Sequence, residues 1–448
     1  MYDRREQVDA HKFTAGRLLA AVLRTDPDAQ NRPLRRTAVG VAGGIGIAIV
    51  VLAGVLIVTF LLGRSGDRWR EPGTLILNED TGSRYMLIGG RLRPVLNHAS
   101  ARLLAKGEPA VETVNSADIA DVPEGAPIGI PGAPDTMPLS GIAGQPWTVC
   151  AGVADGDPKV SVTVGAATGS RPFSPDEAVL LRNGDQFFLA WNGTRLRITE
   201  TWVPQALGFD PKKAVSADST WLNTLPAGPD LGVPPVKRGG AGPTIGGNAT
   251  TRGEVVVVPE AVGDKYFVVD SDGLIPVSET VATLLTANPA SESASPLTLT
   301  PAQLAAEKVL AGPAWQAGMP PKPPKALDTG AEVPCVRWQN DHTTLVAAPG
   351  PVGAPVSDAV GISRDGRVAD AVAVAPGGGM LARTQPAPGQ SGVGIYLITE
   401  AGAKFPVASS EAAQALGYAV ESAEPVPAEL LALLPTGPVL DLFEDKKK

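Results

Sequence analysis

Side chains suited to imidazole or thiolate chemistry are scarce in this chain of 448 residues, which has three histidines and two cysteines. Beyond the amino-terminal tail, general-base catalysis by imidazole would have to rest on His98 or His342. Both lie in segments that internal repeats or a cysteine-bearing strand explain structurally. A zinc site would need two more ligands at close spacing, and the histidines do not supply them. We therefore expect neither histidine catalysis nor a metal site.

Nucleotide-binding and hydrolase motifs are also lacking. There is no G-x-x-x-x-G-K-[ST] phosphate loop, and the glycine run from Ala375 to Arg383 lacks the lysine and the hydroxyl. G-x-S-x-G and H-E-x-x-H do not occur either. Asp264, Asp270 and Asp272 fall at a predicted hairpin turn, where aspartate is favoured for local hydrogen bonding. We expect no catalytic residue and no cofactor, and a non-standard nucleotide site is the alternative left open.

The most informative segment that is present is an apolar run without charges from Thr37 to Gly63. About 20 helical residues cross a bilayer core, so this run is long enough. A signal peptide would have a shorter apolar stretch, without about 36 residues before it. Arginines flank both ends, which disfavours a helix buried in a soluble core. The sequence predicts a membrane-spanning helix from Ala38 to Leu62.

Charge and cysteine usage suggest the orientation of this helix. Residues 1–37 carry eight basic and five acidic side chains, whereas the rest of the chain is acidic. The positive-inside rule places the basic tail in the cytoplasm, although three arginines after the run weaken the signal. Cys150 and Cys335 both lie in the large carboxyl-terminal part, and such a pair in an exported domain is most simply a disulfide. We predict a single-pass protein of the cell membrane with a cytoplasmic amino terminus and a disulfide-bonded extracytoplasmic domain.

The amino-terminal tail has a helical pattern of its own. Apolar residues recur at roughly helical spacing between Val8 and Arg24, with basic residues between them. Such a helix could lie on anionic headgroups, dock on a cytoplasmic partner, or merely orient the span. The breadth of the apolar stripe favours docking, through Phe13, Arg17, Leu18 and Val22.

Four segments of the carboxyl-terminal part align with one another, beginning at Tyr85, Phe188, Tyr266 and Tyr396. Each opens with an aromatic residue and a short apolar strand, followed by a polar or glycine turn and a second strand. An amphipathic helical stretch comes next, and polar residues are available to cap its start, such as Asn97, Ser278 and Ser410. Three copies then end in a Pro-x-Gly motif, and the third copy has diverged. We predict a ββα unit, repeated four times.

The order of these parts indicates a duplicated half, because repeat, cysteine segment and repeat occur twice in succession. Cys150 and Cys335 would then hold equivalent positions in one central domain. Glycine and proline are frequent, and stretches such as Pro235–Gly253 favour extended connections. We expect an α+β chain with an elongated, pseudo-twofold ectodomain. Its predicted parts are a tail (1–37), the membrane helix (38–62), a connector (63–84), repeat 1 (85–130), the central domain (131–186), repeat 2 (187–232), a linker (233–265), repeat 3 (266–315), the central domain again (316–395), repeat 4 (396–441) and a tail (442–448).

Several distinctive motifs are spread over nearly the whole chain, and IGIPGAPDTM and LRPVLNHASARLL are the most specific. The segments concerned are Arg4–Leu18, Asp26–Thr37, Leu92–Leu104, Ile128–Met137, the WTVC strand ending at Cys150, and Tyr396–Val407. Together they resemble the EccB family of type VII (ESX) secretion systems of actinobacteria.

This resemblance implies a structural membrane subunit whose ectodomain forms the extracytoplasmic part of a secretion complex. It implies four repeats around a disulfide-closed central domain. The implied partners are the FtsK/SpoIIIE-type motor ATPase EccC, the EccD and EccE subunits, the mycosin protease and further copies of the chain, with no nucleic acid. Two alternatives accompany it: ATP hydrolysis by the chain itself, and anchoring to peptidoglycan.

Overall fold

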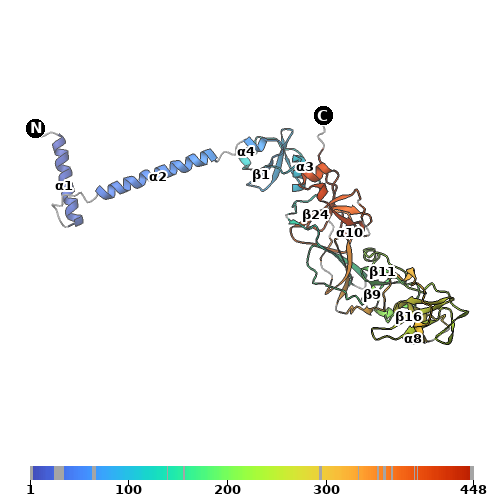
Figure 1. The fold of residues 1–448 in the computed structure, drawn as a ribbon. Helices are drawn as coiled ribbons and strands as arrows, with labels where there is room; N and C mark the ends of the chain where they lie inside the picture. Colours follow the sequence, from blue (N-terminus) through green and yellow to red (C-terminus); the bar gives the residue numbers. More distant parts are fainter. Residues whose placement is uncertain are drawn as a thin grey trace. The chain divides into compact units, whose positions relative to one another are not determined.

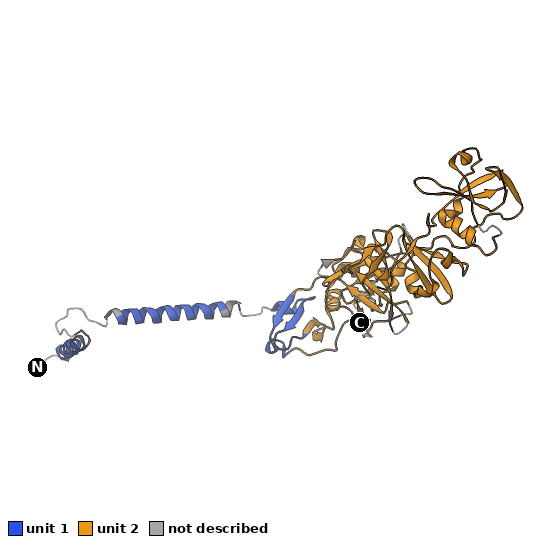
Figure 2. Ribbon diagram, turned by 90° about the horizontal axis from the view of Figure 1, so that it is seen from below, with its two compact units in different colours: residues 1–83, 111–121 blue, residues 84–110, 122–448 orange. Residues whose placement is uncertain are grey.

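The computed structural model describes residues 4–24, 35–62, 67–138, 140–154, 157–291, 295–330, 332–350, 353–356, 360–364, 367–387, 389–390 and 392–443. The chain forms two compact units, residues 1–83 with 111–121 and residues 84–110 with 122–448 (Figure 2). Helices and strands are mixed throughout, in agreement with the predicted α+β class.

Two long helices begin the first unit. α1 spans Arg4–Arg24 and α2 spans Arg35–Leu62 (Figure 1). The apolar stretch Thr37–Val58 of α2 is entirely unburied by the rest of the chain. Valine, glycine, isoleucine and alanine make up most of it, and an apolar helix of this length without protein cover is suited to a lipid bilayer. A helix is present where the membrane-spanning helix was predicted, from Arg35 to Leu62.

The remainder of the first unit is a small folded segment. It holds a 3-10 turn η1 (Asp67–Arg70), the parallel strands β1 (Leu75–Asn78) and β4 (Val111–Val114), and a short helix α4 (Ser116–Ile119). The side chain of Asn115 caps α4 by accepting from the backbone N–H of Asp118. These elements give the chain a folded segment soon after α2.

Repeats 2, 3 and 4 contain four-stranded sheets of one topology. A first strand pairs with the predicted hairpin, and a fourth strand returns parallel to the first. The strand orders are β11-β10-β9-β12, β17-β16-β15-β18 and β26-β25-β24-β27. Repeat 1 has the matching hairpin of β2 (Arg84–Ile88) and β3 (Arg91–Pro94). The ββα prediction therefore captured the middle of a larger unit.

The strands of these three sheets are β9 Glu177–Asn183, β10 Gln186–Trp191, β11 Thr194–Arg197, β12 Val215–Ser216, β15 Val255–Val258, β16 Lys265–Asp270, β17 Gly273–Val277, β18 Leu297–Thr298, β24 Gly378–Gln385, β25 Ile395–Ile398, β26 Lys404–Pro406 and β27 Glu424–Pro427. Two short strands join their margins, β19 (Lys325–Ala326) beside β9 and β5 (Ser140–Gly141) beside β24.

A helix follows each hairpin: α3 (His98–Ala105), α5 (Val203–Ala206), α7 (Glu279–Ala287) and α9 (Ser410–Ala415). Asn97 and Ser278 cap α3 and α7 as predicted, each accepting from the N–H three residues on. The predicted cap Ser410 was wrong by one residue. Ser409 caps α9 by accepting from Ala412 N–H at 3.1 Å, because Ser409 has the extended backbone of a cap.

A second set of short helices and 3-10 turns lies in the tails of the repeats and between them: η2 Pro211–Lys213, α6 Ser219–Leu222, α8 Pro301–Ala305, η3 Ala314–Gln316, η4 Val420–Ser422 and α10 Ala428–Ala432.

The Pro-x-Gly motif marks the place where each tail returns along the hairpin. In repeats 1, 2 and 4 the carbonyl of Pro123, Pro226 or Pro435 accepts from the start of the second hairpin strand, at 2.9–3.0 Å. Two residues after the proline, the glycine N–H donates to the carbonyl of the same strand residue, which is Leu92, Arg195 or Lys404. The tail thus satisfies backbone groups on the free edge of the hairpin.

Glycine is required in this motif because a side chain of the hairpin occupies the space that a Cβ atom would need. That side chain belongs to the residue after the one that pairs with the glycine. A Cβ atom on Gly437 would overlap the ring of Phe405, and one on Gly228 would overlap the side chain of Leu196. Both of those side chains are buried. Repeat 3, with Leu310 in the corresponding place, keeps the backbone pairing through Leu274.

The central sheet has the order β22-β23-β7-β6-β20-β21-β8. Its core is shared with repeats 2 and 4, through residues such as Leu181 of β9 and Ala382 of β24. Repeats also meet through their helices: α3 contacts α9, and α5 contacts α7. The helix of repeat 1 therefore packs on repeat 4, and that of repeat 2 packs on repeat 3. The central strands are β6 Trp147–Ala154, β7 Asp157–Val164, β8 Arg171–Pro172, β20 Val333–Gln339, β21 His342–Ala348, β22 Ala354–Pro355 and β23 Ala371–Val374.

Repeat 3 has a cover that the sequence did not predict. The stretch Pro235–Gly253, expected to be an extended connection, forms a hairpin of β13 (Ala241–Ile245) and β14 (Asn248–Thr251). Gly246 and Gly247 adopt positive φ at its turn, and the Thr250 hydroxyl donates to the carbonyl of Pro243. Ile245 then packs on the face of the repeat sheet opposite α7.

We predict that Gly437→Ala lowers the stability of the protein, because the new methyl group would displace the buried ring of Phe405. Overpacking of this kind costs about 1–3 kcal/mol. Thermal unfolding of the detergent-purified protein measures the effect. Gly107→Ala is the control, since a Cβ there meets no atom within 4 Å. Equal melting temperatures for the two variants would contradict the role given to Gly437.

Candidate functional site: the disulfide-centred core

The two cysteines meet in the middle of the central sheet. β6 and β20 pair antiparallel, and Cys150 lies directly opposite Cys335 with their Cα atoms 4.0 Å apart. The disulfide links residues 185 positions apart, and both cysteines are buried against Val346 and Ala348. The predicted bond is confirmed, and it joins the two halves of the duplicated chain.

The hairpins on either side of the disulfide are equivalent. Ala154 pairs with Asp157 to close the β6–β7 hairpin, and Gln339 pairs with His342 to close the β20–β21 hairpin. Each closing pair lies four and seven residues after its cysteine. The four inner strands β7-β6-β20-β21 thus match about a local pseudo-twofold axis through the disulfide. The outer strands differ, since β23 runs parallel to β7 whereas β8 runs antiparallel to β21.

Repeat 2 is fixed to this sheet by a tryptophan. Trp221 of α6 is fully buried, and its indole N–H donates to the carbonyl of Val149 at 3.0 Å. Val149 is the neighbour of Cys150 on β6. Leu222 and Leu225 join the same core, as do Leu430 and other leucines from the tail of repeat 4. The tails of repeats 2 and 4 therefore cover the disulfide-bearing sheet.

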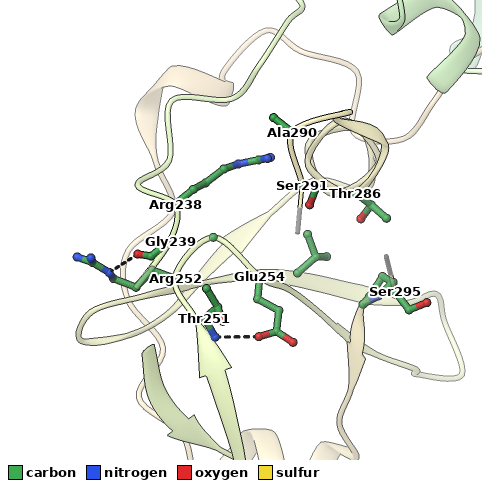
Figure 3. Close-up of a pocket in the computed structure, with 12 residues that line it drawn as sticks. Arg238, Gly239, Thr251, Arg252, Glu254, Thr286, Ala290, Ser291 and Ser295 are labelled. Carbon is green, nitrogen blue, oxygen red and sulfur yellow. Dashed lines mark hydrogen bonds between the residues drawn. The ribbon is translucent and has the colours of Figure 1, made fainter. Parts of the chain in front are cut away.

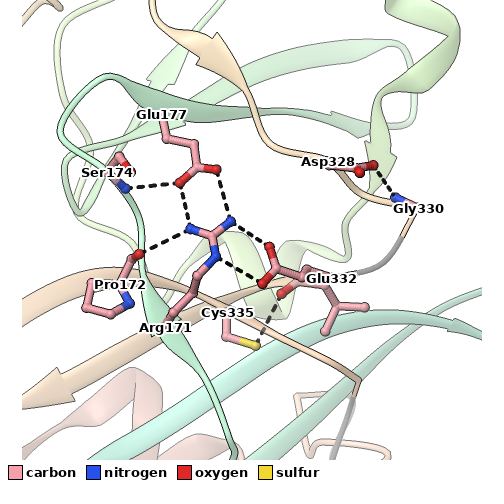
Figure 4. Close-up of polar contacts among 9 residues, drawn as sticks. Arg171, Pro172, Ser174, Glu177, Asp328, Gly330, Glu332 and Cys335 are labelled. Atoms are coloured by element: carbon pink, nitrogen blue, oxygen red, sulfur yellow. Dashed lines mark hydrogen bonds and ion pairs between the residues drawn. The ribbon is translucent and has the colours of Figure 1, made fainter.

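An arginine connects the central sheet to the sheet of repeat 2 (Figure 4). The guanidinium of Arg171 on β8 donates twice to Glu332, at 3.0 and 2.6 Å, and twice to Glu177, at 2.9 and 3.1 Å. Glu332 immediately precedes β20, whereas Glu177 begins β9. The planar guanidinium matches both carboxylates with paired hydrogen bonds, an arrangement a lysine cannot reproduce. Arg171 with its two carboxylates is called the arginine clasp below.

The clasp changes the acidity of Glu177. Its hydrogen bonds from Arg171 hold the pKa of Glu177 below its usual 4.5, with a smaller contribution from the backbone N–H of Ser174. The same pairing raises the pKa of Arg171. At neutral pH the pair of Arg171 and Glu177 is therefore fully charged.

The remaining residues singled out in the sequence occupy structural positions. His98 is the first residue of α3, and burial, with a smaller effect of Arg102, lowers its pKa. His342 begins β21 and is exposed. Asp270 pairs with Gly273 at the β16–β17 turn, as the hairpin prediction required. Within the described residues, no group of three or more acidic, histidine or cysteine side chains could hold a metal ion.

A cavity of about 180 Å³ in repeat 3 contains two arginines (Figure 3). Figure 3 shows the guanidinium of Arg238 directed toward the segment of Ala290 and Ser291. Arg238 donates to the carbonyl of Leu285 near the end of α7, at 3.1 Å, and burial lowers its pKa. Arg252 donates to the carbonyl of Gly239. Both side chains thus donate to backbone carbonyls, and the described residues that line the cavity include no lysine.

The proposed docking residues lie on α1. Phe13, Leu18 and Val22 are 66%, 64% and 80% exposed, and the guanidinium of Arg17 lies 5.8 Å from the centre of the Phe13 ring. Their apolar surface is available on this helix.

Sequence reasoning missed two buried or bridging cations. The arginine clasp joins residues far apart in the chain, so no local pattern marks it. Lys404 is 7% exposed and donates to the carbonyls of Leu431 and Leu434 at the end of α10, both at 2.7 Å. The aligned repeats held one signal for Lys404. The equivalent strand position is Leu92, Arg195 or Leu274 in the other repeats, so a lysine there is unusual.

We predict that Glu177→Gln lowers the melting temperature at neutral pH, because it removes the charge of one side of the clasp. A carboxylate with a lowered pKa stabilises the fold above its unfolded pKa, and this contribution is lost as pH falls through the folded value. The difference in melting temperature between wild type and variant should therefore become smaller below about pH 4.5. Thermal melts across this range test it, with exposed Glu200→Gln as the control. A gap that stays constant down to acid pH would contradict the clasp.

Known proteins with similar sequences and structures show the family to which this chain belongs. A family described as "Type VII secretion system ESX-1, transport TM domain B" matches residues 2–444. The "ESX-5 secretion system ATPase EccB5" of Mycobacterium tuberculosis (strain ATCC 25618 / H37Rv) is 32% identical over 468 residues, covering 97% of this chain and 91% of that protein.

Two solved structures resemble the chain along most of its length. A chain of the periplasmic assembly from the ESX-5 inner membrane complex superimposes with a TM-score of 0.69 at 30% identity, covering 87% of this chain and 99% of that one. A chain of the EccB3 dimer from the ESX-3 core complex gives a TM-score of 0.64 at 27% identity, covering 82% and 98%. The chain therefore belongs to the EccB family of type VII secretion systems.

Proposed function

We propose that this protein is a structural subunit of a type VII secretion complex, and that it contributes geometry while a partner hydrolyses ATP. It is a single-pass inner-membrane protein with a large folded domain outside the membrane. The observation that carries the proposal is the core itself: one disulfide-centred sheet, covered by the tails of two repeats. Such a core is suited to holding surfaces at fixed positions.

The orientation proposed is the one that the charge pattern favours, with α1 in the cytoplasm and the repeats outside. The position of the disulfide supports this, because such bonds persist in oxidising compartments. A related chain occurs in a periplasmic assembly, which supports the same orientation.

The partners proposed inside the membrane complex are the motor ATPase EccC, EccD and EccE, with the mycosin protease outside. Self-association through the ectodomain is supported by the dimer formed by a related chain. Docking on the cytoplasmic side would use the exposed apolar side chains of α1. No part of the proposal involves nucleic acid.

ATP hydrolysis by the chain itself is the competing function, because the related EccB5 is named an ATPase. The sequence has no phosphate-binding loop. Anchoring to peptidoglycan would be compatible with the structural role, and sedimentation of the ectodomain with purified peptidoglycan distinguishes it.

We predict that the detergent-purified protein, free of the motor ATPase, forms oligomers without ATP turnover above the buffer background. Phosphate release and size-exclusion chromatography with light scattering measure the two properties on one sample. Phosphate release is also measured for the variant Arg238→Gln, because Arg238 lines the arginine-containing cavity. Robust turnover that a point substitution in this chain abolishes would overturn the structural proposal.

We also predict that deletion of residues 1–25 leaves the protein folded and membrane-inserted but lowers its incorporation into the complex. The full-length double variant Leu18→Glu, Val22→Glu should have the same effect, since it removes apolar surface from α1. Co-purification with EccC, EccD and EccE measures incorporation. Lys12→Gln, which leaves the apolar residues intact, is the control. Normal incorporation of both altered proteins would contradict a docking role.

A further inference from the structure

A short 3-10 turn between the membrane helix and the repeats carries two exposed arginines. η1 packs along β4, which belongs to the same unit. Trp69 at its centre is 3% exposed, and the guanidinium of Arg70 lies 4.2 Å from the centre of the indole ring. The Thr74 hydroxyl and the Glu71 N–H both donate to the carbonyl of Arg68. The turn is therefore fixed to folded protein, while Arg68 and Arg70 are exposed.

The length of the chain keeps this turn near the membrane. α2 ends at Leu62 and η1 begins at Asp67, so residues 63–66 alone separate them. Five steps between Cα atoms cover at most about 18 Å when fully extended. The headgroup layer extends roughly 5–8 Å beyond the hydrocarbon on each side. Arg68 and Arg70 thus have headgroups within reach once α2 crosses the bilayer.

Beyond α2, all basic residues of the first unit lie within residues 63–70, together with one acid, Asp67. These basic residues are Arg64, Arg68 and Arg70. The unit's other folded segments carry acids alone, namely Glu71, Glu79, Asp80, Glu112, Asp118 and Asp121.

The local counter-ion of the turn is weakly held. Asp67 lies 3.3 Å from Arg70, but its side chain is 91% exposed. Exposed pairs of this kind contribute little and exchange readily for other anions. For Arg68, the described residues show no ion pair within the turn. Both guanidinium groups are therefore available to an external anion.

We propose that η1 binds the headgroup phosphates of anionic phospholipids, through Arg68 and Arg70, in the leaflet that faces the ectodomain. A guanidinium presents paired N–H donors that match phosphate oxygens. Burial of Trp69 fixes the short turn, on which Arg68 and Arg70 are both exposed. The contact accounts for two of the three arginines on the side of the span where the positive-inside rule does not favour them. It rests on α2 crossing the membrane, as in the proposed function.

The test uses the full-length protein in nanodiscs of phosphatidylcholine with and without phosphatidylglycerol. Native mass spectrometry counts the phosphatidylglycerol molecules retained by the protein on release from the disc. The variant is Arg68→Gln, Arg70→Gln. The control is Lys212→Gln, Lys213→Gln, which removes two exposed basic residues from another 3-10 turn, η2. Alkaline extraction of membranes verifies insertion of every variant.

We expect the arginine variant to lose retained phosphatidylglycerol, with binding weaker by roughly fivefold for each arginine. The lysine variant should retain as much phosphatidylglycerol as wild type. In nanodiscs of phosphatidylcholine alone, no variant should differ from wild type in the lipid that it retains. Unchanged retention by the arginine variant would overturn the inference, as would an equal loss in the lysine variant. Loss of complex assembly with unchanged lipid retention would assign the arginines to an acidic protein partner and also overturn it. Failure of wild type to resist alkaline extraction would instead defeat the membrane role of α2.

Discussion

The pairing of β6 with β20 is the contact on which the rest of the ectodomain depends. These strands come from opposite halves of the chain, and the Cys150–Cys335 bond fixes their register. Closing a loop of 185 residues removes much of the unfolded chain's freedom, which the chain-entropy account values at about 5 kcal/mol. Hairpins, repeat tails and the arginine clasp are all built outward from this pair.

Each repeat presents two surfaces that must be covered, and the molecule covers them in different ways. The helix faces are paired, α3 with α9 and α5 with α7. The opposite sheet faces of repeats 2 and 4 are buried in the central core. Repeat 3 uses its own β13–β14 hairpin for that purpose. Its sheet is therefore packed on one face by the β13–β14 hairpin and on the other by α7. This packing does not use the central sheet.

The sequence was informative wherever the signal was local or repeated. An unbroken apolar run predicted α2, aligned aromatic and turn residues predicted the hairpins, and two cysteines in matching halves predicted the bond. The short fourth strands β12 and β18, with two residues each, lack any period that would reveal them. The β13–β14 hairpin was missed because glycine-rich composition was taken to mean a spacer, whereas Gly246 and Gly247 supply its turn. The clasp and Lys404 depend on long-range packing, which one sequence does not encode visibly.

The pairing of repeats crosses the duplication. Each half of the chain contributes a first and a second repeat, yet α3 of the first half packs on α9 of the second, and α7 of the second half packs on α5 of the first. The arrangement is that of an isologous dimer whose two chains have been joined end to end. The connection near residue 235 is then a covalent tether between two matching halves. A chain opened there would still be held by two helix contacts and one disulfide.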